Sequence, residues 1–465
     1  MHSGNIALGR RHFLGTGLAA SLGIAAGLPA WQQSLAAAEG TAGDPPAERP
    51  RVSSPRATSG DEEIEPNWDE RLTVTIGQQD AQIVGRDDKA LQAAVDYVTR
   101  YGGGTVRILP GTYKLRNAVW LNSKVRLLGS GEDTILIKEA MLRTPLAVDS
   151  DWYDQEVTLQ DAKGFQVGDG ICLRCVNPHN QSPTVIKRTL VARSGNRFKL
   201  DRPLRENLWK LGEAYAATLF PILTGENISQ VAIQNLVLDG NRANNDLLDG
   251  NHAGGIFLQD CRKIDIRGVT SRNYHGDGIS WQICHDVTVE HCRSHNNSGL
   301  GLHPGSGSQR PVMRFNKLEQ NDIGLFFCWG VKYGLAEKNE IRDNRGSGVS
   351  IGHRDTDNIV RDNDIIGSGK VGVLFRPERG QGFSADRNLI ENNRIVDSGD
   401  ASGVAVDVQG FTTAVQLKKN SIRETRGAQQ RVAIRLGANA GQIDLAGNEV
   451  DGFAKLLDDQ RKSAG

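Results

Sequence analysis

The segment GISWQI, residues 278–283, is one of a series of short apolar segments that open on a glycine and recur along the chain. The opening glycines are separated by 23, 23, 23, 24, 24 and 31 residues, and the last segment opens on an alanine after a further 30. A period of this length is typical of a solenoid, in which each repeat forms one coil. The opening residues are Gly255, Gly278, Gly301, Gly324, Gly348, Gly372, Gly403 and Ala433.

The second and fourth residues of these segments are apolar, as in Ile279 and Trp281, and among sixteen such positions only Pro304 departs from the rule. Alternation with a period of two predicts a β-strand with one face toward a core. A second short strand and an asparagine-rich third element follow in most repeats. The pattern therefore predicts an all-β fold, a right-handed parallel β-helix whose coils rise by about 4.8 Å. Asparagine at the bends is expected in side-chain ladders or left-handed turns.

The regions around the regular repeats predict a cap, an insertion and a tail. Residues 87–113 are typical of a helix followed by a strand, and the helix is expected to plug the open end of the solenoid. The period breaks at 140–215, where we expect a small inserted antiparallel β subdomain. The segment VDGFAKLLDDQ, residues 450–460, predicts a short closing helix. The expected boundaries are 71–139 for the cap and first coils, 140–215 for the insertion, 216–455 for the main coils and 456–465 for the C-terminal tail.

The N-terminal region indicates export. The segment GRRHFLG, residues 9–15, precedes a Gly- and Ala-rich apolar run and the small residues AAA at 36–38. It resembles a twin-arginine signal with Arg10 and Arg11 as the pair, so we expect 1–38 to direct the protein to the periplasm or exterior of a bacterium. A membrane anchor is the alternative, disfavoured because the run is rich in glycine and near the minimum spanning length. Residues 39–70 predict a disordered linker.

The charge of the chain excludes one group of partners. Lysine plus arginine number 55 and aspartate plus glutamate also number 55, so the formal net charge is zero. No net field attracts nucleic acid or an anionic membrane surface, and no later segment reads as a transmembrane span. We therefore expect neither nucleic acid nor, once the signal is removed, a membrane as partner. The oligomeric state stays open.

Three sequence blocks resemble a known superfamily. They are ALQAAVDY (90–97), GGGTVRILPGTYKL (102–115) and KVRLLGSGEDTIL (124–136). With the glycine-phased coils, they resemble the pectin lyase-like right-handed parallel β-helix superfamily over about residues 72–455. The narrower likeness is to bacterial exported proteins with a rhamnogalacturonase or epimerase type pectate lyase domain. The resemblance implies a polysaccharide or oligosaccharide substrate, but the superfamily includes hydrolases, lyases, epimerases and non-catalytic surface proteins.

Two specific mechanisms within that superfamily do not carry over. Polygalacturonases place aspartates just before the opening residues of successive coils, whereas here only Asp277 is a carboxylate at such a position. The GHG histidine of those enzymes is also missing at the corresponding place. Calcium-dependent pectate lyases carry clustered aspartates and an arginine base, and no equivalent cluster is present.

The residues between the apolar positions of the first strand are expected to point to solvent. They include His303, with Ser280 and Phe326 at the same position on the neighbouring coils. Gly305 and Gly352 have no side chains that would project from this surface, which suits a groove where a sugar ring lies close to the backbone. A solvated histidine without function is the alternative for His303. The groove is expected over the coils from 278 to 372, with the long connections 238–255 and 377–387 as walls.

Polar residues gather on this face and just past the ends of three consecutive strands. The catalytic candidates, for proton transfer or nucleophilic attack, are Asp277, His303, His353, Asp355 and Glu378. The substrate-binding candidates are Trp329, Lys332, Arg354, Arg376, Gln282 and Asp407. At one coil rise, the carboxyl groups of Asp355 and Glu378 are expected roughly 5–9 Å apart, which suits both retaining and inverting hydrolases. A ladder of surface salt bridges is the alternative.

The sequence calls for no cofactor and predicts no metal site. Calcium in the loop that carries Asp239, Asp246 and Asp249 is a weaker alternative, because the spacing matches no known ligand loop. The pair Cys172 and Cys175 lacks partners at zinc spacing. The remaining open question concerns Cys261 and Cys284, which occupy the same offset on adjacent coils and allow either a disulfide or a stack of thiols.

These features together predict an exported carbohydrate-active enzyme that cleaves glycosidic bonds of an acidic polysaccharide. Hydrolysis is slightly favoured, because carboxylates as well as bases border the expected groove. A polysaccharide lyase or a uronate epimerase is the alternative chemistry. A non-catalytic glycan-binding or surface structural β-helix protein is the alternative class. The sequence leaves open the glycan and the stereochemical outcome.

Overall fold

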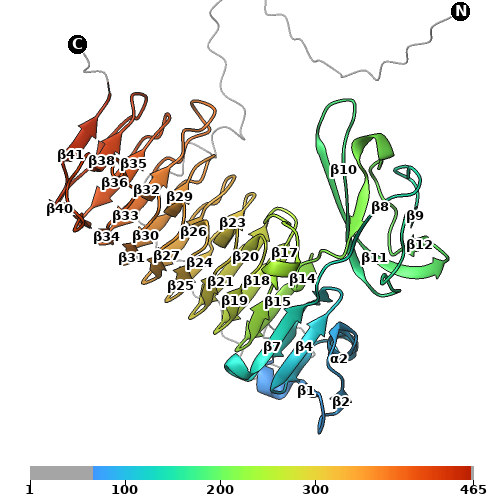
Figure 1. Ribbon diagram of the computed structural model, residues 1–465. Coiled ribbons are helices and arrows are strands. Elements are labelled where there is room, and N and C mark those ends of the chain that lie inside the picture. The colour runs from blue at the N-terminus through green and yellow to red at the C-terminus, as the bar shows by residue number, and fades with distance from the viewer. Residues whose placement is uncertain (1–65, 462–465) are drawn as a thin grey trace, which may run out of the picture. The chain divides into compact units, whose positions relative to one another are not determined.

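The computed structural model describes residues 66–461 (Figure 1). The export signal expected at 1–38 and most of the linker expected at 39–70 lie outside the described residues. The described part begins with a 3-10 turn, η1 (Trp68–Glu70), and contains one α-helix, α2 (Asp88–Arg100). Three further 3-10 turns are η2 (Gly131–Asp133), η3 (Lys210–Gly212) and η4 (Arg242–Asn244).

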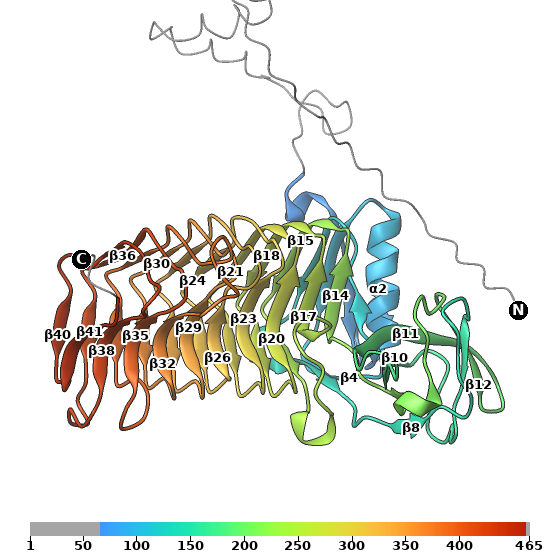
Figure 2. The same cartoon turned by 90° about the horizontal axis from the view of Figure 1, so that it is seen from above.

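Three long parallel sheets, which we name A, B and C, run the length of the stacked coils (Figures 1 and 2). Sheet A consists of β2 (Ile83–Val84), β1 (Leu72–Gly77), β3 (Gly104–Ile108), β6 (Val125–Leu128), β15 (Ser229–Gln234), β18 (Arg262–Arg267), β21 (His285–Glu290), β24 (Val312–Arg314), β27 (Leu335–Glu337), β30 (Ile359–Arg361), β33 (Leu389–Glu391), β36 (Val415–Lys418) and β39 (Ile443–Asp444). Sheet B consists of β4 (Gly111–Leu115), β7 (Thr134–Lys138), β16 (Val237–Asp239), β19 (Thr270–Arg272), β22 (Arg293–His295), β25 (Lys317–Glu319), β28 (Glu340–Arg342), β31 (Asp364–Ile366), β34 (Arg394–Val396), β37 (Ser421–Arg423) and β40 (Glu449–Asp451). Sheet C consists of β5 (Val119–Trp120), β14 (Leu223–Glu226), β17 (Gly254–Gln259), β20 (Asp277–Gln282), β23 (Leu300–Gly305), β26 (Ile323–Phe326), β29 (Ser347–Ile351), β32 (Val371–Phe375), β35 (Val404–Val408), β38 (Val432–Leu436) and β41 (Lys455–Asp459).

The glycine-opened segments form the strands of sheet C, in the register that their period predicts. Ile279 pairs with Leu302, and Trp281 pairs with Pro304, one coil above. The side chain of Trp281 is fully buried, and the alternate residues of these strands fill the interior between the three sheets. The predicted right-handed β-helix is confirmed, and the proline that broke the apolar rule also faces the core.

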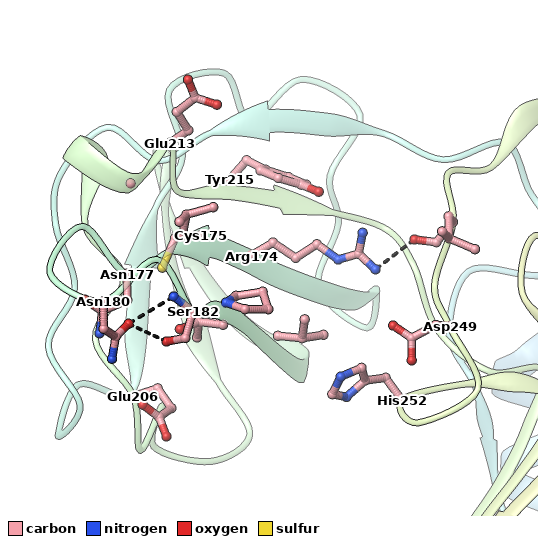
Figure 3. A pocket seen from close by; sticks show the side chains of 16 residues that line it. Arg174, Cys175, Asn177, Asn180, Ser182, Glu206, Glu213, Tyr215, Asp249 and His252 are labelled. Carbon is pink, nitrogen blue, oxygen red and sulfur yellow. Dashed lines mark hydrogen bonds between the residues drawn. The ribbon is translucent and has the colours of Figure 1, made fainter. Parts of the chain in front are cut away.

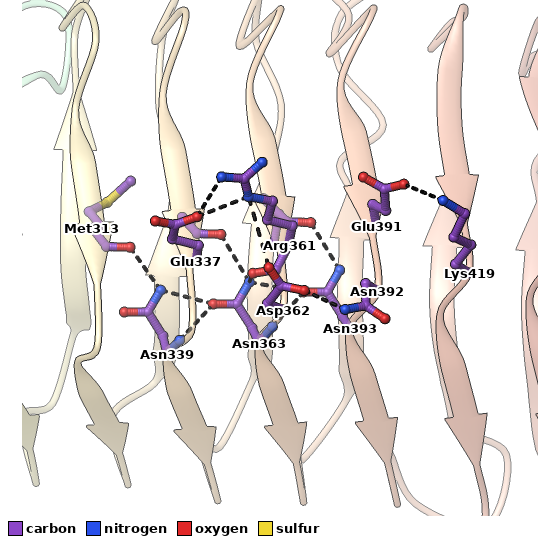
Figure 4. Close-up of polar contacts among 12 residues, drawn as sticks. Met313, Glu337, Asn339, Arg361, Asp362, Asn363, Glu391, Asn392, Asn393 and Lys419 are labelled. Carbon is purple, nitrogen blue, oxygen red and sulfur yellow. Dashed lines mark hydrogen bonds and ion pairs between the residues drawn. The ribbon is translucent and has the colours of Figure 1, made fainter.

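Asparagine ladders join the coils at the bends, as predicted (Figure 4). The amide of Asn339 donates hydrogen bonds of 2.9 Å to the carbonyl of Met313 and to Oδ1 of Asn363 on the next coil. Asn363 repeats the arrangement with Asn393, and Asn393 with Asn420. Because a buried amide without partners is costly, the ladder satisfies polar groups that the turns take out of water.

Helix α2 covers one end of the stacked coils (Figure 2). Its apolar face, Leu91, Ala94, Val95 and Val98, is buried against the first strands. Asp87 caps its N-terminus by accepting a hydrogen bond from the backbone N–H of Ala90 at 3.1 Å. The predicted capping helix is therefore confirmed. None of the helices within residues 66–461 has the length and apolar character needed to cross a lipid bilayer.

The break in the period corresponds to a separate antiparallel sheet, which we name D and which forms the inserted subdomain. It contains its own buried apolar cluster, including Phe198 and Leu190. Its strands, in spatial order, are β8 (Arg143–Pro145), β13 (Tyr215–Ala217), β10 (Gly170–Val176), β11 (Pro183–Ser194), β12 (Arg197–Leu200) and β9 (Glu156–Thr158).

The closing helix predicted near the C-terminus is wrong, because this segment forms strand β41. Ile434 of β38 pairs with Leu457 of β41 in parallel. The edge of sheet C presents a row of unpaired backbone groups to this segment. A strand satisfies them, whereas an isolated helix of this length is marginal in water.

Candidate functional site

The outward face of sheet C carries the residues that the sequence singled out, but it is mostly covered. Ser280 and Ser350 are fully buried, and only 3% of His303 and 5% of Gln282 is exposed. The prediction that these positions are open to solvent is therefore wrong. The physical reason is that a loop and long side chains lie over the strands.

His303 forms a buried pair with Asp277. Nδ1 of His303 lies 2.8 Å from Oδ2 of Asp277, and each side chain is 4% exposed. The other oxygen of Asp277 accepts the backbone N–H of Leu300 at 2.9 Å. With the ring proton on Nδ1, facing the carboxylate, Nε2 presents a lone pair, and it has no hydrogen-bond partner within the described residues. An aspartate that orients a histidine in this way is the arrangement of a general base.

A loop formed by residues 245–253 covers this pair, and Gly250 lies directly on it. The carbonyl of Gly250 accepts hydrogen bonds from Oγ of Ser280 at 2.6 Å and from the amide of Gln282 at 3.3 Å. A Cβ atom at position 250 would lie 1.6 Å from Oδ2 of Asp277 and 2.7 Å from Nδ1 of His303. Only glycine fits this close approach.

The inserted subdomain holds the same loop from its other side. Arg174 of β10 donates to the carbonyl of Leu247 at 2.7 Å, and the ammonium group of Lys187 of β11 donates to the carbonyl of His252. Leu248, between them, is fully buried in the main core. The sequence predicted this long connection as a wall of the groove. In the structure it covers the Asp277–His303 pair, and hydrogen bonds from sheet C and from the inserted subdomain hold it in place.

Arg376 of the next cluster is engaged by protein groups at each of its nitrogens. Its guanidinium lies 3.3 Å from Asp355 and 3.2 Å from Glu378. It also donates to Oγ of Ser350 and to the carbonyl of Phe327, both at 2.9 Å. Because these contacts use the guanidinium within the protein, it is not available to a substrate anion in this conformation.

Asp355 is fully buried and holds the ends of two coils together. Its carboxylate accepts the backbone N–H groups of Gly330, Val331 and Gly352, each at 2.9 Å. Burial raises its pKa to about 7, and Arg376 and the three N–H groups offset part of that rise. A carboxyl group without exposed surface cannot contact a sugar, so the expected Asp355–Glu378 catalytic pair is not formed at the surface.

Trp329 forms an exposed aromatic platform above His353. The two rings stack with centroids 3.9 Å apart, and 52% of Trp329 is exposed. Nδ1 of the buried His353 lies 3.5 Å from the carboxylate of Glu378. Two exposed arginines flank this platform: Arg379 lies 5.6 Å from the centre of the Trp329 ring, and Arg354 packs over Phe383, beside His353. The structure thus brings together Trp329, His353, Arg354 and Glu378 as expected.

Phe326 connects the two clusters. Its ring meets His303 edge-on with centroids 5.4 Å apart, and the guanidinium of Arg376 lies 4.3 Å from its centre. The Asp277–His303 pair and the Trp329 platform therefore belong to one continuous face of neighbouring coils.

Two expected substrate-binding residues lie apart from this face or are neutralised. The backbone of Lys332 pairs with Gln309 and Thr356, and its charge interacts with that of Asp357. Asp407 is 1% exposed and paired with Arg435, so it is not available to a sugar.

The three loop aspartates considered for calcium do not converge. Asp239 pairs with Arg272 at 2.8 Å, Asp246 with Arg143 at 3.3 Å, and Asp249 accepts a backbone N–H of its own loop. No cluster of three metal-ligating side chains occurs between residues 66 and 461.

All six cysteines are thiols in this structure. The backbone N–H of Cys261 lies 3.3 Å from Sγ of Cys284, so these two residues form the stack that the sequence allowed. A hydrogen bond with Cys261, together with burial, raises the pKa of Cys284 and suppresses its reactivity.

A cavity of about 670 Å³ lies outside the region where the sequence predicted the groove. It is bounded by β10, β11 and β13 of the inserted subdomain and by the loop at Leu247, Asp249 and His252 (Figure 3). Sequence reasoning missed it, because the strands of an insertion carry no repeat that would place their side chains beside the coils.

Comparison with known proteins agrees with this architecture. A family model described as right handed beta helix region matches two overlapping segments, residues 227–376 and 328–450. The solved structure of PfbA, a surface adhesin of Streptococcus pneumoniae, superposes with a TM-score of 0.50 at 13% identity, covering 82% of this chain and 93% of that one. The A-module of the mannuronan C-5 epimerase AlgE6 of Azotobacter vinelandii gives a TM-score of 0.47 at 16% identity, covering 82% and 97%. No curated protein matches the chain in sequence.

The three parallel sheets and the family match define the class of the protein. The chain has the right-handed parallel β-helix fold, and the family model of that description matches residues 227–450. Membership of the pectin lyase-like superfamily is a prediction. The narrower likeness to a rhamnogalacturonase or epimerase type pectate lyase domain stays a prediction.

Proposed function

We propose that the protein is an exported carbohydrate-active enzyme that acts on an acidic polysaccharide with His303 as general base. The observation that carries this proposal is the Asp277–His303 pair, in which the carboxylate engages Nδ1 and leaves Nε2 buried without a partner. A buried nitrogen without a partner costs free energy, and a substrate proton is the group that would satisfy it. Asp277 would stabilise the imidazolium that forms.

The chemistry that this base supports is removal of the proton from the sugar carbon next to a uronate carboxylate. In a lyase, the electron pair of that C–H bond forms a double bond to the neighbouring carbon. The bond from that neighbour to the glycosidic oxygen then breaks, and the oxygen leaves with a proton from an acid. In an epimerase, a proton returns to the same carbon from the opposite face. Both reactions begin with the same proton transfer to Nε2.

Hydrolysis, which the sequence slightly favoured, has less support from the geometry. It requires two carboxyl groups on either side of the scissile bond. The burial of Asp355 leaves Glu378 as the carboxylate below Trp329, and Arg376 neutralises Glu378. We therefore rank β-elimination or epimerisation above hydrolysis.

The Trp329 platform supports an acidic sugar as substrate. Sugar rings stack on exposed tryptophan, and the nearby Arg354 and Arg379 offer guanidinium groups to a carboxylate. About four coil rises, roughly 19 Å, separate β20, which carries Asp277, from β32, which precedes Glu378, so a polysaccharide chain of a few sugars spans the whole face.

The test is a panel of polygalacturonate, alginate and hyaluronan assayed for three products. Unsaturated ends absorb in the ultraviolet and indicate a lyase, reducing ends alone indicate a hydrolase, and inverted uronates seen by NMR indicate an epimerase. His303→Gln is expected to abolish the product. His285→Gln is the matched control, because its ring also has a nitrogen without a partner but lies on sheet A. Equal activity of both variants would reject His303 as the base.

A non-catalytic glycan-binding protein is the second candidate, and the burial of His303 under Gly250 favours it. In that case the polysaccharides bind but none is converted. His303→Gln then leaves binding unchanged, whereas Trp329→Ala weakens it.

A further inference from the structure

Two contiguous cavities lie along strand β11 of the inserted subdomain. The larger, of about 670 Å³, faces the loop 245–253 (Figure 3), and the smaller, of about 280 Å³, faces the first strands of sheet C. Val185 and Glu206 line both, so the cavities adjoin. Pockets for small ligands measure about 300–1,000 Å³. The two cavities together are therefore large enough for more than one sugar.

The larger cavity carries more negative than positive charge. Three exposed carboxylates line it, Glu206, Glu213 and Asp249, and within the described residues none forms an ion pair. Of these, Asp249 lies near the end of the Arg174 side chain (Figure 3), whose Nε has no hydrogen-bond partner among the described residues. His252 adds no charge near neutral pH, since burial lowers its pKa. This lining accepts hydrogen bonds from hydroxyl or ammonium groups and repels a carboxylate.

In the smaller cavity, positively charged residues outnumber negatively charged ones. Trp120 forms one wall, and Lys187 packs against Phe257 with its ammonium 4.0 Å from the ring centre. Arg202 is half exposed and pairs with Asp201 at 3.4 Å and with Glu226 at 3.8 Å. The charged residues that line this cavity are Lys187, Arg188, Arg202, Glu206 and Glu226.

We propose that these cavities are consecutive sugar subsites for an acidic heteropolysaccharide, the larger taking a neutral or amino sugar and the smaller the neighbouring uronate. The proposal rests on the proposed function and adds the composition of the substrate. The carboxylates of the larger cavity favour hydroxyl and ammonium groups, whereas the cations of the smaller one attract a carboxylate.

The position of the larger cavity connects it with His303. Asp249 and His252 line the cavity, and Gly250, between them, lies on the Asp277–His303 pair. A single segment of backbone therefore separates the sugar in this cavity from the base. A polymer bound here contacts the loop that must move before Nε2 can reach a substrate.

The experiment measures binding by calorimetry in the His303→Gln background, which removes turnover. Three hexasaccharides serve as probes: hyaluronan, with alternating uronate and N-acetylated amino sugar, oligogalacturonate, with uronate alone, and chitosan, with amino sugar alone. Hyaluronan is expected to bind most tightly. Glu213→Gln with Asp249→Asn, which line only the larger cavity, should weaken chitosan binding about tenfold and spare oligogalacturonate, because hydrogen bonds to charged groups are lost. Arg202→Gln should weaken oligogalacturonate about tenfold and spare chitosan.

Two substitutions in the same subdomain are matched controls. Glu156→Gln and Arg197→Gln remove an exposed ion pair of sheet D that lines neither cavity, and both should bind all probes as the parent does. The subsites are rejected if no hexasaccharide binds, or if the cavity and control variants bind alike. Binding as expected without conversion of any polymer rejects the enzyme and keeps the subsites. Conversion that the cavity variants leave unchanged keeps the enzyme and rejects the subsites.

Discussion

Nδ1 of His303 lies 2.8 Å from Oδ2 of Asp277, although 26 residues separate them in the chain. Strands β20 and β23 are neighbours in sheet C, and Ser280 stands opposite His303, so the register of the coils sets this distance. Gly250 covers this pair and separates it from solvent. Access to His303 is therefore controlled by the loop 245–253.

Replacing Gly250 by alanine should uncover His303. The added Cβ would overlap the carboxylate of Asp277, so the loop must move away from the pair. Diethyl pyrocarbonate should then modify His303 faster than in the wild type, as peptide mass spectrometry measures. Asn251→Ala, an exposed change in the same loop, is the control and should leave the rate unchanged. An unaltered rate in Gly250→Ala would contradict a covering role for the loop.

Replacing Asp277 by asparagine should lower kcat for the polysaccharide reaction by about a hundredfold or more, because the imidazolium loses its partner. Asp286→Asn removes an exposed ion pair with Arg310 on sheet A and should leave kcat unchanged. A loss of kcat equal in both variants would point to a general effect on folding.

Lys138 should make the stability of the protein depend on pH. It is fully buried between the rings of Phe220 and Tyr274, and burial lowers its pKa from 10.5 to about 7. Between these values the unfolded chain binds a proton that the folded chain lacks, so stability rises with pH by up to about 1.4 kcal/mol per pH unit. Lys138→Met should remove this contribution and be most stabilising at pH 7 and below.

Urea denaturation at pH 6 and pH 9.5 measures the effect of Lys138→Met. The gap in unfolding free energy between the variant and the wild type should be wide at pH 6 and narrow at pH 9.5. A gap that is the same at both pH values would show that the ammonium group keeps its usual pKa in the fold.

Asp355 should contribute to stability rather than to chemistry. Asp355→Ala leaves three backbone N–H groups, two of them buried, without their acceptor and should lower the unfolding free energy by about 3–5 kcal/mol. Asp364→Ala, which removes an exposed ion pair with Arg394, should cost about 1 kcal/mol or less. Thermal or urea unfolding gives both values. Equal costs would show that burial adds nothing at position 355.

The repeat determined how much of the fold could be predicted. Trp281 and Pro304 lie opposite each other in the core because the period of 23 residues sets the register of neighbouring coils. The clustering of Trp329, His353 and Glu378 followed from the same period. Strand β41 was missed because pairing with a sheet edge depends on tertiary contacts and not on local pattern.

The burial of the site could not be read from the repeat. His303 is covered by Gly250, which belongs to a connection outside the regular coils and is held by Lys187 of the insertion. Asp355 is buried because its partners are backbone N–H groups of the preceding coil, and backbone groups leave no trace in side-chain pattern. The repeat predicts that a side chain points out of the strand, away from the core. Whether that side chain is exposed to solvent depends on which other parts of the chain cover it.

The two ends of the coil stack differ, since α2 closes one and β41 forms the edge strand at the other (Figure 2). Each coil of a solenoid contacts only its neighbours. A pulling force along the axis would therefore separate the coils one after another, starting at the β41 end. The force–extension curve would show a series of small, evenly spaced rupture events instead of one large event. Because helix α2 closes the opposite end, the coils at that end would separate last.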